Sequence, residues 1–249
     1  MTDIILCGCS GNMGHVITQC CERFDECKIV CGIDLNTEAK YDYPVYADIN
    51  EFQGKADVII DFSHPNALRS VLDYAVKNKI PVVESTTGLS DEQINEIKDA
   101  SKKVAVFHSA NMSLGVNLLC ELAKKAVNVL GNGFDIEIVE MHHNQKIDSP
   151  SGTALMIADA INEELPVEFD YEFDRHSKRS KRTDREIGIH SVRGGTIVGE
   201  HEVIFAGNDE IIKLSHSASS KQIFANGAIN AARYLAKQNP GLYSMKDLI

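Results

Sequence analysis

The sequence contains neither a long apolar run nor an excess of positive charge. No segment approaches the roughly 18 apolar residues that cross a bilayer, and the first six residues carry no basic cluster of the kind that opens a signal peptide. We therefore expect a cytoplasmic protein with no membrane partner. Asp and Glu outnumber Lys and Arg by 36 to 25, for a net charge of -11. This balance makes nucleic acid a poor partner, because its phosphates would be repelled.

Metal-binding cysteine pairs are missing too. None of the seven cysteines forms a CxxC pair, and six of them lie within residues 7–31. A zinc cluster is the alternative, but Cys7 and Cys9 flank a glycine on a turn with another function. Reduced thiols in a core explain the pattern better, so we expect no metal site.

Short apolar runs and amphipathic stretches alternate over the first hundred residues. With 43% hydrophobic residues, the chain has ample material for a packed core. Buried strands are expected at residues 4–7, 29–33, 58–61, 82–84 and 104–107. Amphipathic helices are expected at residues 13–24, 65–78 and 91–102. This alternation predicts an α/β fold with a parallel sheet.

The pattern changes after a longer helix expected over residues 115–130. Ile136, Ile138 and Glu140 alternate with their neighbours as in a strand. Further strands are expected at residues 187–193, 202–205 and 210–215, with one helix at residues 153–165. Because such an open sheet leaves one face to be covered, we expect self-association.

A glycine-rich turn joins the first expected strand to the first helix. Its spacing is GxxGxxG, in the segment Gly8, Cys9, Ser10, Gly11, Asn12, Met13 and Gly14. Glycine lets the backbone approach a pyrophosphate, whose charge the amides of the helix N-terminus receive. The pattern is typical of a dinucleotide site, although a tight turn without a ligand is the alternative.

The residue that ends the second strand supports a dinucleotide. Asp34 follows Gly14 by about 20 residues, where a carboxylate accepts hydrogen bonds from the adenosine ribose. No arginine stands beside it to receive a 2′-phosphate, and the carboxylate would repel one. We therefore expect NADH to bind better than NADPH, with Lys40 as the nearby cation that weakens this inference.

These segments predict an α/β protein of two domains. The amphipathic tail at residues 220–237 is expected to pack back on the first domain. We expect a Rossmann domain of residues 1–112 plus 217–249, with a parallel sheet completed by the C-terminal helix. Residues 113–216 are expected to form a central α+β domain with an open mixed sheet, for substrate binding and oligomerisation.

A basic segment lies between the expected helix and the following strand of the second domain. Its cations are Arg175, Lys178, Arg179, Lys181, Arg182 and Arg185. They would suit a mobile arm near an anionic substrate. A solvated loop of mixed charge is the simpler interpretation.

Residues 140–154 end a strand with titratable groups and open a helix with small residues. If the strand continues through His142 and His143, their imidazoles point to opposite faces, which disfavours a shared metal. Lys146 places a positive charge beside the strand end. A helix N-terminus follows, with hydroxyls and amides from Ser151, Gly152 and Thr153. Both features suit a bound carboxylate, whereas a simple helix cap with solvated side chains is the alternative.

Residues 142–154 read HHNQKIDSPSGTA, which closely resembles the HHxxKxDxPSGTA signature of the 4-hydroxy-tetrahydrodipicolinate reductases, or dihydrodipicolinate reductases. Other segments resemble the same family. They are the glycine turn, DFSHP at residues 61–65, SANMSLGVN at residues 109–117, and residues 187–207 and 224–228. The resemblance therefore covers essentially the whole chain.

The resemblance implies an NADH- or NADPH-dependent enzyme of lysine and diaminopimelate biosynthesis. Its substrate, a small cyclic dicarboxylate, loses its 4-hydroxyl as water and accepts a hydride. The resemblance also implies a homotetramer built from four central sheets. By position, His142 corresponds to the general acid, Lys146 to a second proton donor or carboxylate-binding group, and His143, Gly152 and Thr153 to substrate contacts. The residues corresponding to nicotinamide-side contacts are Ser85, Thr86, Thr87, Ser109, Ala110, Asn111 and Met112.

Three residues depart from the family pattern. Asn12 stands where the cofactor loop often has arginine, and Leu35 stands where NADPH users often have a basic residue. Both reinforce the expected preference for NADH. Ser85 replaces the usual first glycine of GTTG, which bears on the detailed nicotinamide contact.

Two other functions fit parts of the sequence. Another NAD(P)-dependent dehydrogenase of amino-acid metabolism, such as an aspartate-semialdehyde type, needs a reactive cysteine. The only cysteine outside residues 7–31 is Cys120, in an apolar helical stretch. A non-enzymatic redox sensor that binds NADH would have no use for His142 and Lys146 together.

Overall fold

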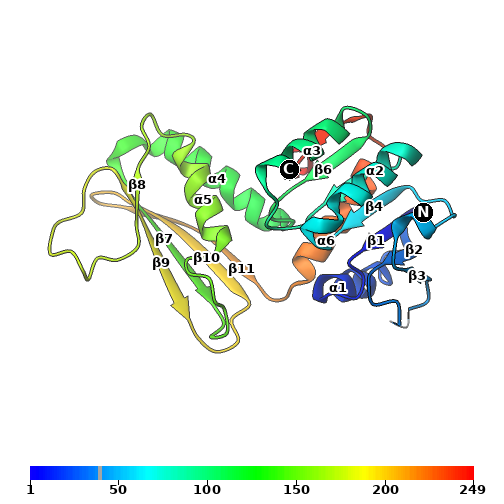
Figure 1. The fold of residues 1–249 in the computed structure, drawn as a ribbon. Coiled ribbons are helices and arrows are strands. Elements are labelled where there is room, and N and C mark those ends of the chain that lie inside the picture. The colour runs from blue at the N-terminus through cyan, green and yellow to red at the C-terminus, as the bar shows by residue number, and fades with distance from the viewer. Residues whose placement is uncertain (39–40) are drawn as a thin grey trace. The chain divides into compact units, whose positions relative to one another are not determined.

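The computed structural model describes residues 1–38 and 41–249, apart from the side chain of Asn132. The chain folds as two compact units (Figure 1). Unit 1 consists of Met1–Leu114 and Lys221–Ile249, and unit 2 consists of Gly115–Ser220. Both ends of the chain therefore belong to the same unit.

Unit 1 contains a seven-stranded sheet in the order β12-β6-β5-β4-β1-β2-β3, with neighbouring strands parallel. Its strands are β1 Thr2–Cys7, β2 Cys27–Ile33, β3 Val45–Tyr46, β4 Val58–Asp61, β5 Val82–Glu84, β6 Ala105–His108 and β12 Gly241–Tyr243. Its α-helices are α1 Asn12–Cys21, α2 Leu68–Asn78, α3 Asp91–Ser101 and α6 Gln222–Leu235. Short 3₁₀ helices are η1 Ile49–Glu51, η2 Pro65–Ala67 and η4 Met245–Leu248.

Helices cover both faces of this sheet (Figure 1). Because successive side chains of a strand point to opposite faces, Ile4 and Leu6 pack with α1 and α6, whereas Ile5 packs with α2. Burial on both faces explains why the strands appear in the sequence as continuous apolar runs. The packing of α6 completes unit 1 from the C-terminal segment, as expected.

Unit 2 contains a mixed five-stranded sheet in the order β11-β10-β7-β9-β8. Its strands are β7 Asp135–His142, β8 Asp170–Glu172, β9 Glu186–Arg193, β10 Gly199–Ala206 and β11 Ile211–Ala218. The helices α4 Leu114–Leu130 and α5 Gly152–Asn162 pack on one face, and η3 Gly131–Gly133 follows α4. On the opposite face, side chains such as Val139 and Ile204 are only half-buried. The predicted fold class, a Rossmann-like sheet plus an α+β unit with a mixed sheet, is confirmed.

The differences from the predicted elements are local. The strands β3, β8 and β12 were not predicted, and each has only two or three residues. The strand β7 ends at His142, so His143 lies just beyond the strand. Within the described part of the chain, no helix combines the length and apolar character required to cross a membrane.

Candidate functional site

The glycine turn of unit 1 has the geometry that close backbone approach requires. Gly8 adopts a φ of +77°, and a Cβ added there would lie 2.5 Å from the carbonyl oxygen of Phe62. A Cβ on Gly14 would collide with the carbonyl oxygens of Gly8 and Cys9. The helix α1 starts after Gly11 and has no side-chain cap. Its N-terminal amides are therefore suited to a phosphate group.

Asp34 lies directly beside this turn. Its Oδ2 accepts a hydrogen bond of 3.0 Å from the amide of Ser10, and its Oδ1 accepts one of 3.0 Å from the amide of Asn36. The half-buried carboxylate thus ties the end of β2 to the glycine turn. Leu35 beside it is 92% exposed, whereas Lys40 lies outside the described residues.

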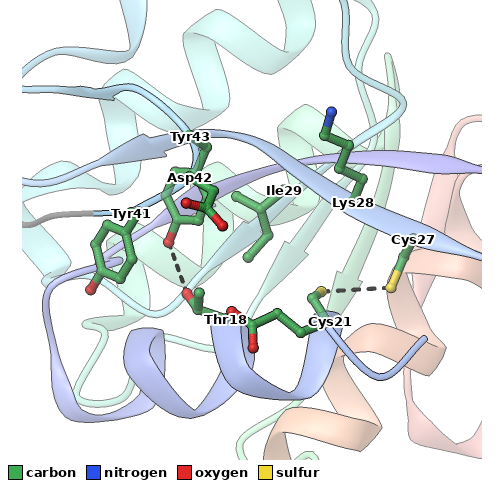
Figure 2. Close-up of a pocket in the computed structure, with 9 residues that line it drawn as sticks. Thr18, Cys21, Cys27, Lys28, Ile29, Tyr41, Asp42 and Tyr43 are labelled. Carbon is green, nitrogen blue, oxygen red and sulfur yellow. Dashed lines mark hydrogen bonds between the residues drawn. The ribbon is translucent and has the colours of Figure 1, made fainter. Parts of the chain in front are cut away.

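A separate cavity of about 280 Å³ lies between α1, β2 and residues 41–43 (Figure 2). None of the predicted site residues lines it. One of its walls supports the glycine turn, because the hydroxyl of Tyr41 donates a hydrogen bond of 2.8 Å to the carbonyl of Cys9. The ring of Tyr41 stacks on Tyr43, whose hydroxyl lies 2.8 Å from Thr18 Oγ1.

The predicted nicotinamide-side residues follow the carboxyl ends of two neighbouring strands. Ser85, Thr86 and Thr87 come after β5, and residues 109–112 come after β6. The carboxyl edge of a parallel sheet is where dinucleotides bind in this type of fold. Thr87 and Ala110 are exposed, whereas Ser85, Thr86, Asn111 and Met112 are buried. Met112 belongs to the hydrophobic core, so its side chain anchors the segment.

In unit 2, His142 forms a hydrogen-bonded pair with a glutamate that the sequence interpretation did not assign to the site. His142 Nδ1 lies 2.6 Å from Oε2 of Glu140, whose side chain is fully buried. Arg193 on the neighbouring strand β9 binds both oxygens of Glu140, at 2.7 and 2.6 Å. Burial alone would raise the pKa of Glu140, but hydrogen bonds from Arg193, Ser191, His142 and the amide of Ser151 lower it to about 2.

This arrangement determines which nitrogen of His142 is available. An ionised carboxylate only accepts hydrogen bonds, so the Nδ1 of His142 carries the proton directed at Glu140. The Nε2 is then the nitrogen that can exchange a proton with a ligand. Gly199 leaves space beside it, because a Cβ on Gly199 would lie 3.1 Å from this Nε2.

Ser151 connects the histidine strand to the start of α5. Its amide donates a hydrogen bond of 3.1 Å to Glu140, and its hydroxyl accepts one of 3.1 Å from Ala154 as the helix N-cap. The same hydroxyl lies 3.0 Å from Nε2 of His201 on β10. Burial, together with the nearby His142, lowers the pKa of His201 to about 4. His201 is therefore neutral at physiological pH.

The remaining predicted substrate residues lie in the segment between β7 and the first turn of α5. Lys146 lies in the turn after β7, and its Nζ is 2.8 Å from Asp148 Oδ1. This contact is the first cause of the lowered pKa of Asp148. His143 is half-buried just after β7, and Gly152 and Thr153 form the first turn of α5. A carboxylate near this turn would benefit from the lysine charge and the helix dipole.

Glu140, Arg193 and His201 are the residues that sequence reasoning missed. Glu140 carried a usable signal, because it shares the strand face of Ile136 and Ile138, both buried. A carboxylate on such a face requires a partner. In the described residues no group of three or more His, Cys, Asp or Glu side chains is arranged to hold a metal ion.

The basic segment of residues 174–186 is tied to its own unit. Arg175 lies 2.9 Å from Glu137, and Arg182 lies 2.9 Å from Asp135. Lys178 pairs with Glu172. These ion pairs favour a surface loop over a mobile arm that binds an anionic substrate.

Comparison with known proteins identifies the family. The model described as dihydrodipicolinate reductase, N-terminus, matches residues 2–112, and the model for the C-terminus matches residues 115–249. The chain belongs to the dihydrodipicolinate reductase family. The predicted resemblance, and with it an oxidoreductase of this family, is confirmed.

Relatives in this family are similar over the full chain. A 4-hydroxy-tetrahydrodipicolinate reductase of Caldanaerobacter subterraneus is 53% identical, and one of Clostridium novyi is 49% identical, each over 100% of this chain and 98% of the relative. A dipicolinate-bound dihydrodipicolinate reductase from Paenisporosarcina sp. TG-14 is 25% identical, with a TM-score of 0.84 and full coverage of both chains. A probable dehydrogenase from Thermotoga maritima, 13% identical with a TM-score of 0.63, shares the fold.

Proposed function

We propose that the protein reduces 4-hydroxy-tetrahydrodipicolinate to tetrahydrodipicolinate, with loss of water, in lysine and diaminopimelate biosynthesis. The family models cover both units, and the curated relatives carry the name of this activity. The observation that carries the assignment is the pairing of His142 with the ionised Glu140 at the end of β7, close to a lysine and a helix N-terminus. This combination suits an anionic substrate that needs a proton.

The residues of unit 1 fit a nicotinamide dinucleotide. The uncapped start of α1 and the glycine turn, residues 8–14, would hold the pyrophosphate, and Asp34 would hold the adenosine ribose. Residues 85–87 and 109–112 would bind the nicotinamide side. When bound, the reduced nicotinamide supplies the hydride.

His142 is proposed as the general acid. Glu140 holds the imidazole by Nδ1 and orients it, so that Nε2 delivers a proton to the carbon next to the reduced one. Arg193 keeps Glu140 ionised and fixed. Glu140 is therefore a positioning residue that acts through His142.

Lys146 and the first turn of α5 are proposed to bind the substrate carboxylates. The lysine ammonium offers a charge-assisted hydrogen bond, and Ser151, Gly152 and Thr153 place the positive end of the helix dipole nearby. His143 completes the proposed substrate contacts. The solved Paenisporosarcina relative holds dipicolinate, itself a cyclic dicarboxylate, which supports a ligand of this class here.

Three finer assignments belong to the same proposal. We infer a preference for NADH, because Asp34 would repel a 2′-phosphate and Leu35 offers no cation. We infer a homotetramer in which the half-buried face of the unit 2 sheet, with Val139 and Ile204, is covered by other copies. The proposed location is the cytoplasm, where this biosynthetic reaction takes place.

The alternative of a cysteine-dependent dehydrogenase has little support. Cys120 is buried, and burial raises the pKa of its thiol to about 11. Little thiolate is therefore present at neutral pH, and the thiolate is the nucleophilic form.

The decisive experiment measures oxidation of NADH and NADPH by the purified protein. The substrate is generated in place from pyruvate and aspartate semialdehyde by the preceding synthase. We expect turnover that favours NADH and falls at least about 100-fold in His142→Gln, as for loss of a general acid. His176→Gln, at an exposed histidine, is the matched control and should match the unmodified protein. Dinucleotide binding without turnover of either cofactor would contradict the proposal.

A further inference from the structure

Two buried carboxyl groups face each other in unit 1, next to the turns that are proposed to bind the dinucleotide. Asp61 ends β4 and Glu84 ends β5, and the two residues are directly opposite in the parallel register. Both are 0% exposed. Paired positions point to the same face of a sheet, so the two carboxyl groups lie side by side at the ends of adjacent strands.

A hydrogen bond between two carboxyl groups requires a proton on one of them. The inner oxygens are occupied: Asp61 Oδ1 accepts the amide of Ser63 at 2.8 Å, and Glu84 Oε1 accepts the amide of Thr86 at 2.7 Å. The outer oxygens, Asp61 Oδ2 and Glu84 Oε2, are buried without a hydrogen-bond partner in the described chain. Two adjacent buried negative charges would be strongly unfavourable. Burial raises the pKa of both groups, and the charge of Asp61 raises that of Glu84 further.

The neighbouring groups supply no compensating positive charge. His108 stands opposite Glu84 on β6, but burial lowers its pKa and favours the neutral imidazole. Cys7 stands opposite Asp61 on β1, and burial raises the pKa of its thiol, which therefore stays neutral. On α2, which covers this face, the hydroxyl of Tyr74 donates to the carbonyl of Phe52. The proton of the pair is thus the available means of neutralisation.

Each carboxyl group also holds a turn. Glu84 fixes the turn at Thr86, within the segment proposed to meet the nicotinamide. Asp61 fixes the turn at Ser63, whose Cα would lie 3.0 Å from a Cβ on Gly8. The turn at Ser63 therefore packs directly against the glycine turn at Gly8. Loss of the proton would push apart the two strand ends that carry these turns.

We propose that Asp61 and Glu84 share one proton, and that this proton holds both turns of the dinucleotide site in their binding geometry. The inference rests on the proposed function, since it takes the cofactor site to be at this edge of the sheet. The two residues are positioning residues and touch neither cofactor nor substrate. Dinucleotide affinity then depends on pH through a buried pair that the reaction does not use.

The first test is a titration of NADH binding from pH 6 to pH 10 by fluorescence or calorimetry. Once the pair loses its proton to the buffer, the Kd of the unmodified protein rises by up to tenfold per pH unit. Glu84→Gln supplies a permanent N–H donor to Asp61 and still accepts from Thr86, so its Kd stays near the low-pH value throughout. Asp61→Asn places the N–H donor on the other residue of the pair, so its Kd for NADH should also stay near the low-pH value. The control Glu51→Gln, at an exposed glutamate, follows the unmodified profile.

Two further results separate the possible failures. NADH binding with the same pH profile in the unmodified protein, Glu84→Gln and Asp61→Asn overturns the inference and leaves the proposed function intact. An absence of NADH binding in every form refutes the proposed function instead. The proton itself is then tested by infrared spectroscopy of the unmodified protein: a buried protonated carboxyl band at pH 7 that disappears in Glu84→Gln supports the shared proton, and no such band overturns it.

Discussion

Replacing Glu140 with glutamine removes the charge that Arg193 and His142 share. Glu140 is 0% exposed, and its pKa falls from 4.5 to about 2 in the folded protein. Each pKa unit corresponds to about 1.4 kcal/mol, so ionised Glu140 stabilises the fold by up to about 3 kcal/mol at neutral pH. The folded pKa lies below the unfolded one. This contribution is therefore complete above about pH 5 and is lost as the pH falls toward 2.

Urea denaturation of Glu140→Gln and the unmodified protein checks this value. The transition of unit 2 must be followed separately, because a protein of two units has no single free energy of unfolding. We expect a difference of about 3 kcal/mol at pH 7, reduced by about 1.4 kcal/mol at pH 3.5. Glu210→Gln, at an exposed glutamate of the same unit, should show neither effect. A difference that is the same at both pH values would refute the assignment to the charge of Glu140.

Three further predictions concern the proposed reaction. Lys146→Ala should weaken substrate binding and turnover about 10- to 100-fold, as for loss of a charged hydrogen bond, and should leave the Kd for NADH unchanged. Loss of NADH binding alone would contradict the assignment. The control is Lys181→Ala, at an exposed lysine. Gly199→Ala should lower kcat about fivefold, because its Cβ would press on His142 Nε2 at 3.1 Å, and an unchanged kcat would contradict this steric argument. The double change Asp34→Ser and Leu35→Arg should move the ratio of NADPH to NADH affinity at least about tenfold toward NADPH, measured by fluorescence titration; an unchanged ratio would show that other residues select the cofactor.

The fold was predictable wherever a periodic pattern extends over several residues. The strand β4 and the helices α2 and α3 follow the expected runs closely, because each buries a repeating apolar face. By contrast, β12 has three residues, and its central Leu242 is 49% exposed. Its pairing with β6 comes from the neighbouring strand, and a pattern within the segment cannot show that.

The candidate site was predictable as a segment and not as a network. His142 and Lys146 belong to one motif, and His142 is linked to the start of α5 through Glu140 and Ser151. Arg193 and His201 come from two other strands, and their approach to Glu140 and Ser151 depends on strand order and register. Sequence alone gave no register for these strands. The tautomer of His142 therefore follows only from the assembled sheet.

Glu140 and Glu84 show why residue type and burial together do not determine charge. Each glutamate is 0% exposed and lies at or near the carboxyl end of a strand, with a backbone amide bound to one oxygen. Glu140 faces the guanidinium of Arg193 and is ionised, whereas Glu84 faces the carboxyl of Asp61 and retains a proton. The neighbouring strand thus decides the protonation state. An arginine introduced opposite Glu84, as in His108→Arg, should accordingly lower the pH at which the shared proton is lost and the protonated carboxyl band disappears. A band that disappears at the same pH as in the unmodified protein would contradict this account.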